Sequence, residues 1–166
     1  NDAKALVLHA LSVGGNADFA NCNRLYRERN SLSSAALAYM VMTFANQNRG
    51  EAQELADVLL SRAKVETVDG RLLVHWESGA RHTWMKDDVE TTALALAGLA
   101  RVKASDAKTG GAAAWLMQQR GCYGFNVVKT RGPVVNGLAR YFGQGRAGSE
   151  DMRITVIVND QEVETI

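Results

Sequence analysis

The chain has few cysteines and almost no proline, and it lacks both a long apolar run and an excess of either charge. Its 166 residues include two cysteines and one proline, and 19 basic side chains balance 18 acidic ones. A balanced charge supplies no overall field that attracts nucleic acid or an anionic membrane. The longest apolar run is well short of the roughly 20 residues that cross a bilayer, so we expect no membrane insertion. At this length the chain forms one ordinary domain with a real core.

What the chain does have is a set of small and leucine-rich stretches with helical periodicity. Four of them recur along the chain, at residues 5–11, 35–41, 93–99 and 134–140. Each of the first three is followed by a turn and a more polar helix that carries an apolar pair, namely Leu25-Tyr26, Leu59-Leu60 and Trp115-Leu116. A helix pair of this size cannot bury its apolar face alone, so neighbouring pairs must stack. The pattern predicts an all-α fold of stacked α-hairpins.

Capping and breaking signals place the expected helices. The three pairs are expected at residues 2–13 and 16–29, 34–46 and about 50–64, and 88–103 and 109–120. Ser33 is expected to cap the helix that begins at residue 34, because its hydroxyl can accept a bond from an unpaired backbone N–H. The only proline, Pro133, is expected in the first turn of the last helix, where its missing N–H costs nothing. That helix is expected to end by residues 143–145.

Two segments depart from the helical pattern. Residues 65–68 and 71–76 are β-prone and flank Asp69-Gly70, a pair that favours a type I′ hairpin turn. Residues 152–158 alternate and are β-branched, and residues 161–166 are expected to return as a second strand. We therefore expect residues 1–145 to form the helical domain, with a β-hairpin insertion at about 65–77. Residues 151–166 are expected to begin a following domain or to clamp onto the helices, and we expect the segment to belong to a longer chain.

The two cysteines, Cys22 and Cys122, permit one disulfide but favour free thiols. They belong to the first and third helix pairs, which are not neighbours in a stack, whereas a disulfide needs Cα atoms within about 7 Å. Neither cysteine has another Cys or His two to five residues away, so the spacing typical of zinc sites is absent. We predict two reduced cysteines.

The densest cluster of chemically versatile side chains consists of His75, Trp76, Glu77, His82 and Trp84. Two histidines and a carboxylate are able to bind a metal ion if the loop brings them together. However, helical ligand spacing is absent, and a tryptophan near each histidine favours packing. We therefore predict that the two tryptophans fasten this loop to the helices, and we assign no metal ligand and no cofactor.

Asp87, Asp88 and Glu90 form a second candidate site, since paired carboxylates carry out acid/base chemistry in glycosidases and cyclases. The same residue types are favoured at a helix N-terminus, where they accept bonds from backbone N–H groups and meet the positive end of the helix dipole. We predict that Asp88 opens a helix that continues through Val102, and we assign no catalytic residue. Residues 115–125 are similar to the repeat ends of terpene cyclases, but the aspartate-rich motif of those enzymes is missing.

Five stretches, taken in order, resemble the thioester-containing domain of the alpha-2-macroglobulin and complement family, in its bacterial branch. They are LYRERNSLS at 25–33, VHWE at 74–77, VETTALAL at 89–96, AWLMQQR at 114–120 and GLARYF at 137–142. The resemblance implies an α/α-toroid, of which this chain forms the later helices, followed by the start of a β-domain. It also implies a parent protein that traps proteases, in which bait cleavage triggers a conformational change and an internal thioester then acylates the attacker.

The chain departs from this family at the thioester itself. The family motif is Cys-Gly-Glu-Gln, but the third residue after Cys22 is Leu25 and the third after Cys122 is Phe125. Residues 126–129 also lack the small hydroxyl residues of the family. The resemblance therefore implies a thioester that lies upstream of this segment or is lost from the parent.

Taken together, the sequence favours a non-enzymatic scaffold of an endopeptidase inhibitor, extracellular or periplasmic, that shields a thioester contributed elsewhere. Its expected partners are proteases, through the parent protein, and the remaining domains of the same chain. One alternative is an α/α-toroid enzyme of terpene-cyclase or glycan-processing type, in which Asp87, Asp88 and the tryptophans line a cavity. The other is a helical-repeat interaction module without chemistry.

Overall fold

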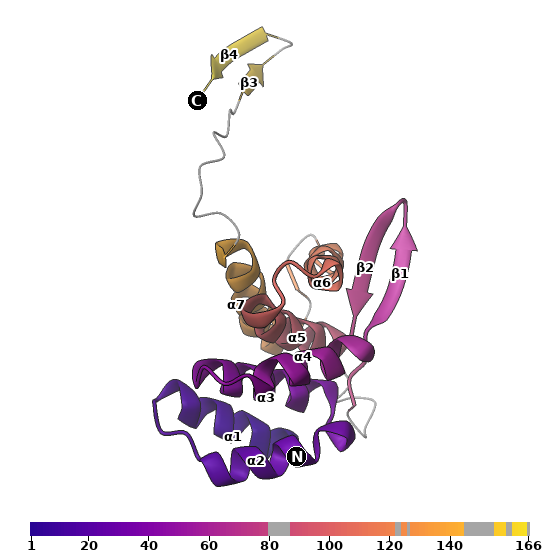
Figure 1. The fold of residues 1–166 in the computed structure, drawn as a ribbon. Helices are drawn as coiled ribbons and strands as arrows, with labels where there is room; N and C mark the ends of the chain where they lie inside the picture. Colours follow the sequence, from indigo (N-terminus) through magenta and orange to yellow (C-terminus); the bar gives the residue numbers. More distant parts are fainter. Residues whose placement is uncertain (80–86, 122–123, 126, 145–154, 159–160, 166) are drawn as a thin grey trace.

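The helices of the computed structural model form two rows (Figure 1). The structure describes residues 1–79, 87–121, 124–125, 127–144, 155–158 and 161–165. The first row contains α1 (Asp2–Val13), α3 (Ser34–Asn46), α5 (Asp88–Val102) and α7 (Val128–Gln144). The second row contains α2 (Phe19–Arg27), α4 (Glu51–Ser61) and α6 (Ala107–Gln118). The predicted all-α stack of hairpins is confirmed, whereas closure into a toroid stays a proposal.

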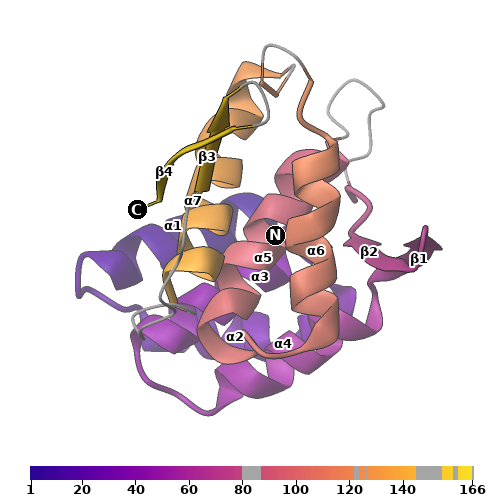
Figure 2. The same ribbon diagram turned by 90° about the horizontal axis from the view of Figure 1, so that it is seen from above.

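The core lies along the first row and between the two rows. In this row α1 packs on α3, α3 on α5, and α5 on α7, and each second-row helix contacts the first-row helices before and after it. Figure 2 shows α5 between α6 and α7. Because α5 has neighbours on several sides, residues 91–100 are all buried, as expected for a helix that is apolar all round. None of the helices in the described ranges is long and apolar enough to cross a bilayer.

Helix starts follow the capping signals. The Ser33 hydroxyl accepts a hydrogen bond from the Ala36 N–H at 3.0 Å, which confirms the predicted cap of α3. α1 has the expected bounds. The expected start of the second helix was wrong: Asp18 caps α2 by accepting from the Asn21 N–H at 3.1 Å, so the helix begins at Phe19.

Pro133 does not open the last helix, because α7 already begins at Val128 and contains the proline. The first turn is held by Thr130, whose hydroxyl donates to the Val127 carbonyl at 2.6 Å. A proline inside a helix removes one backbone bond and crowds the residue before it. Here that residue is Gly132, which has no Cβ to clash with the ring. The prediction did not consider that Gly132 leaves room for the ring of Pro133 inside the helix.

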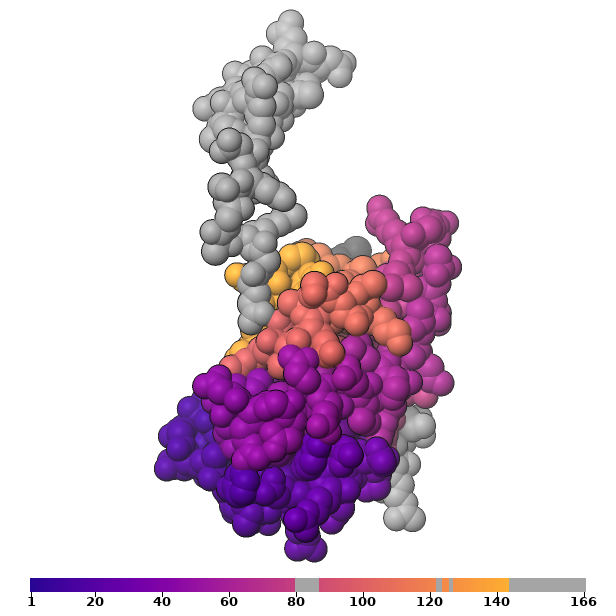
Figure 3. Space-filling model, in the orientation of Figure 1, coloured from indigo at the N-terminus to yellow at the C-terminus, as the bar shows by residue number. Residues whose placement is uncertain are grey.

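The predicted β-hairpin insertion is confirmed. β1 (Lys64–Val68) pairs antiparallel with β2 (Arg71–His75), and the turn residues Asp69 and Gly70 have φ angles of 50° and 73°. β2 packs against α6, while β1 is exposed along its length, and the hairpin stands out from the helical body (Figure 3). A second antiparallel pair joins β3 (Thr155–Val158) to β4 (Gln161–Thr165). Its assignment to a following domain stays a prediction.

Candidate functional site

Trp76 fastens the segment after β2 to the helices, as predicted. Its side chain is fully buried, and its indole N–H donates to the Leu59 carbonyl at the end of α4 at 2.7 Å. Its backbone N–H donates to the Thr92 hydroxyl on α5 at 3.0 Å. One residue therefore links β2 with α4 and α5, and the VHWE stretch is structural at this position.

The neighbours of Trp76 do not come together as metal ligands. The His75 ring stacks on Trp115 of α6 with 5.0 Å between ring centroids, whereas the Glu77 carboxylate lies 3.7 Å from the Lys64 ammonium. His82 and Trp84 lie outside the described residues. Within the described ranges, no three His, Cys, Asp or Glu side chains are grouped in a way that could hold a metal ion.

The carboxylates at the start of α5 are engaged in structural bonds. Asp87 has extended backbone angles and its Oδ1 accepts from the Glu90 N–H at 2.9 Å, so Asp87 is the N-cap. Asp88 opens the helix through Val102, as predicted, but its Oδ1 accepts from the Ser78 N–H at 2.6 Å. The capping role expected of Asp88 thus belongs to the residue before it, because a cap lies just outside the helix. Asp88 instead fastens the segment after β2 to α5.

Lys129 at the start of α7 closes this cluster. Its ammonium lies 2.9 Å from the Glu90 carboxylate and 3.8 Å from that of Asp87. The hydrogen bond that Lys129 donates to the Glu90 carboxylate, followed by the charges of Glu90 and Asp87, raises the pKa of Lys129. A cation from the neighbouring helix therefore offsets part of the charge of the acidic cluster, which is compatible with a structural cap.

We predict that Asp87→Ala lowers the free energy of unfolding by about 1 kcal/mol, the usual contribution of an N-cap side chain. Urea denaturation followed by circular dichroism measures the change. The matched control is Asp57→Ala, which removes an exposed partner of Lys103 and should change stability by less than about 0.5 kcal/mol. If Asp87→Ala instead raised the free energy of unfolding, the Asp87 carboxylate would be destabilising the fold, as catalytic groups often do.

Cys22 lies beside Gln47, a contact that no sequence motif indicates. The thiol is buried, and the Gln47 side-chain N–H points at its sulfur across 3.9 Å. Burial is the largest influence on Cys22 and raises the pKa of its thiol, so the nucleophilic thiolate is disfavoured. Twenty-five residues separate the two positions along the chain, and motif spacing therefore could not find this pair. Cys122 lies outside the described residues, so the predicted absence of a disulfide stays a prediction.

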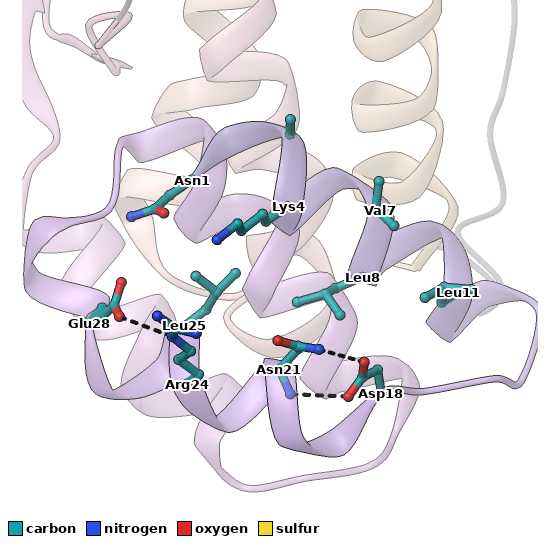
Figure 4. A pocket seen from close by; sticks show the side chains of 11 residues that line it. Asn1, Lys4, Val7, Leu8, Leu11, Asp18, Asn21, Arg24, Leu25 and Glu28 are labelled. Atoms are coloured by element: carbon teal, nitrogen blue, oxygen red, sulfur yellow. Dashed lines mark hydrogen bonds and ion pairs between the residues drawn. The ribbon is translucent and has the colours of Figure 1, made fainter.

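A groove of about 510 Å³ opens between α1 and α2 (Figure 4). Leu8 and Leu25 are buried beneath it, and charged side chains of both helices, among them Lys4, Asp18 and Arg24, stand around it. Four apolar side chains of α1 are 39–68% exposed: Val7 and Leu11 line the groove, whereas Leu6 and Val13 are not among its lining residues. We call these four residues the α1 edge.

The α1 edge is unusual for a helix of the first row. α3 and α5 each have a first-row neighbour on both sides, whereas in the described part of the chain α1 has a single first-row neighbour, α3, besides its contact with α2. Terminal repeats that face water normally carry a polar outer surface. The leucine-rich stretch at 5–11 predicted a core helix, and the structure buries only one face of it.

Comparison with family models, curated proteins and solved structures finds no match to this chain. The likeness to the alpha-2-macroglobulin family therefore depends on the ordered motifs alone.

Proposed function

We propose that this chain is a non-enzymatic helical scaffold within a protease-trapping protein of the alpha-2-macroglobulin type. In that role it packs against further helices of the same domain and shields a thioester contributed by another segment. Such a protein acts outside the cytoplasm, where it meets the proteases it traps.

The observation that carries the proposal is the α1 edge. Four exposed aliphatic side chains, two of them lining an open groove, favour a surface that another element covers, because apolar patches of this kind mark interaction sites on soluble proteins. The helices of the first row already pack side by side, so one more helix pair placed against α1 would extend the same arrangement. A scaffold that continues into further helices accounts for this edge without a separate binding partner.

The family-like stretches support the same proposal through their structural roles. Trp76 of VHWE is buried between β2, α4 and α5, and Glu90 and Thr92 of VETTALAL bind Lys129 and the Trp76 backbone. The enzyme alternative relies on Asp87 and Asp88, and both carboxylates are engaged by backbone N–H groups. The interaction-module alternative also uses the α1 edge, but there a separate partner covers it rather than further helices of the same domain.

Hydrogen exchange of the longer natural protein, compared with this segment alone, separates these alternatives. The proposal predicts that amides of α1 exchange more slowly in the longer protein, because further helices of the same domain cover the α1 edge. Amides of α5, which is buried in both, should be unchanged and serve as the control. Equal exchange of α1 in the two forms would contradict the scaffold proposal and favour an interaction module.

The thioester part of the proposal gives a further prediction. The isolated segment should gain no mass from methylamine and form no covalent adduct with a protease, since an activated acyl group requires a Cys–Gln thioester. The longer protein should gain one methylamine and lose protease capture at the same time. Mass spectrometry reads both outcomes. Because Gln47 lies beside Cys22, a methylamine adduct at Gln47 in the isolated segment would overturn the assignment of the thioester to another segment.

A further inference from the structure

The outer side of α7 carries exposed apolar side chains. Val128, Val135 and Phe142 are 73%, 64% and 52% exposed. α7 is the last helix of the first row, where it packs on α5 and also contacts α6 (Figure 1). The side of α7 toward the core is a different one and includes Val134 and Gly137. The apolar character of α7 therefore extends beyond the side that the domain itself buries.

The exposed positions repeat with the spacing of a helix–helix contact. Val128, Val135 and Phe142 recur at intervals of seven residues, and Gly132 and Ala139, which are also exposed, lie between them. Successive steps of four, three, four and three residues keep all five positions within about 80° of the helix circumference, as in the seam between two paired helices. We call these five residues the α7 face.

The first-row helices already pack through glycines that face the backbone of the next helix. Gly98 of α5 faces the Ala38 carbonyl of α3, and Gly137 of α7 faces the Ala93 carbonyl of α5. A Cβ atom added at either position would crowd that carbonyl oxygen, whereas one added at Gly132 would meet nothing within 4 Å. The α7 face thus has the small residues of a close helix contact but has open space where the neighbouring helix would lie.

The charges beside the α7 face all have one sign. α7 contains Lys129, Arg131 and Arg140 but no acidic residue. Lys129 is paired with the acidic cluster at the start of α5, whereas neither arginine forms an ion pair in the described part of the chain. Arg131 donates to the Phe125 carbonyl at 3.1 Å and Arg140 to the Asn136 side chain at 2.8 Å, and both partners are neutral. Helical periodicity places the two arginines on opposite sides of the face.

This charge pattern selects the occupant. A second copy is disfavoured, because its α7 would bring like charges together and the only carboxylate of its α1, that of Asp2, already accepts from Ser33 at 2.7 Å. The described residues after α7 form β3 and β4 and supply no helix. The face also differs from a contact within this domain, since residues 91–100 of α5 include no charged residue. An apolar centre with arginines at its rim is typical of an interface between proteins.

An anionic membrane would also meet apolar and basic groups on α7. However, helices that lie in a membrane surface insert a broad apolar side with bulky residues. The α7 face is narrow, and two of its five residues are glycine and alanine. A protein helix therefore fits the face better than a lipid surface does.

We propose that the α7 face binds an acidic amphipathic helix of a separate protein. The apolar side of that helix would lie on Val128, Val135 and Phe142, in the manner of other helices that bind through regularly spaced apolar residues. Carboxylates on both sides of it would pair with Arg131 and Arg140, since guanidinium and carboxylate form strong charge-assisted bonds. This inference is independent of the proposed function, because it uses neither the α1 edge nor a thioester.

The test measures the binding of two dye-labelled synthetic helical peptides, each about as long as α7, by fluorescence anisotropy. Both peptides carry leucine at positions spaced four and three residues apart, and these leucines are flanked by glutamate in one peptide and by lysine in the other. The segment should bind the glutamate peptide at least about tenfold more tightly than the lysine peptide, and the difference should shrink at high salt. Equal binding of the two peptides would overturn the proposal.

Two variants of α7 locate the binding site. Val135→Asn should weaken binding of the glutamate peptide at least about tenfold, because it places an amide at the centre of the contact. Val13→Asn makes the same change on the α1 edge, at a residue that is 68% exposed, and should leave the affinity unchanged. The double variant Arg131→Glu and Arg140→Glu should reverse the preference in favour of the lysine peptide. Circular dichroism confirms that each variant is folded. Unchanged affinity of folded Val135→Asn for the glutamate peptide would contradict the assignment to α7.

The longer natural protein and lipid vesicles test the other occupants. The longer protein should bind the glutamate peptide as tightly as the segment does, because a separate protein covers the face. If the longer protein does not bind the peptide, its own chain covers α7 and the proposal is wrong. The segment should not sediment with vesicles that contain phosphatidylserine. Sedimentation that Val135→Asn abolishes would assign the face to a membrane instead.

Discussion

Replacement of Trp76 by alanine should lower the free energy of unfolding by about 3–5 kcal/mol, the usual loss for a large aromatic side chain in a core. Trp76 is fully buried. It directly follows β2 in the chain, its indole N–H bonds to the Leu59 carbonyl of α4, and its backbone N–H bonds to the Thr92 hydroxyl of α5. Alanine would leave a cavity at the point where the hairpin joins the helices. A small domain has a total stability of about 5–15 kcal/mol, so this variant would lose a large part of it.

Trp76→Phe separates the packing from the hydrogen bond. Phenylalanine keeps most of the buried ring but lacks the indole N–H, and the Leu59 carbonyl retains a second donor in the Arg62 N–H at 3.1 Å. We therefore expect a loss of about 1–3 kcal/mol, smaller than that of alanine. Val65→Ala, at a β1 position that is 47% exposed, should change stability by less than about 0.5 kcal/mol. Urea denaturation followed at 222 nm measures all three variants, since tryptophan fluorescence is itself altered. A loss below about 1 kcal/mol for Trp76→Ala would mean that the segment after β2 is not fastened to the core.

The features that the sequence predicts well are local ones. Ser33 caps α3 because a hydroxyl next to a helix start finds its partner within three residues. Asp69-Gly70 forms the hairpin turn because these residues adopt positive φ at low cost. Such features depend on residues a few positions apart, so a short stretch of the sequence is enough to predict them. Their success explains why most helix bounds agree to within a few residues.

The features that the sequence could not predict depend on contacts across the fold. Asp88 bonds to Ser78 ten residues away, a contact that capping rules do not consider. Cys22 and Gln47 lie side by side although 25 residues separate them along the chain, a contact that motif spacing does not give. The α1 edge is the third case: an apolar stretch predicts burial, but it does not say whether the covering element belongs to the same segment.

Gly137 of α7 provides the sharpest test of how closely the first-row helices pack. A Cβ atom added at this position would lie 2.7 Å from the carbonyl oxygen of Ala93 in α5, closer than such atoms approach each other. The obstructing atom belongs to the backbone of a buried helix, so it cannot rotate away as a side chain would. Either α7 or α5 must shift as a whole. This close approach explains why glycine, a poor helix former, stands in the middle of α7.

Gly137→Ala should therefore lower the free energy of unfolding by about 1–3 kcal/mol, the usual cost of overpacking, even though alanine favours helix by up to about 1 kcal/mol. Gly143→Ala is the matched control, because it makes the same substitution in the same helix at a position with nothing within 4 Å of the new Cβ. There only the helix preference acts, and stability should rise by up to about 1 kcal/mol. Urea denaturation of the two variants measures the difference in sign. If both substitutions stabilised the protein, α5 and α7 would be farther apart than the structure places them.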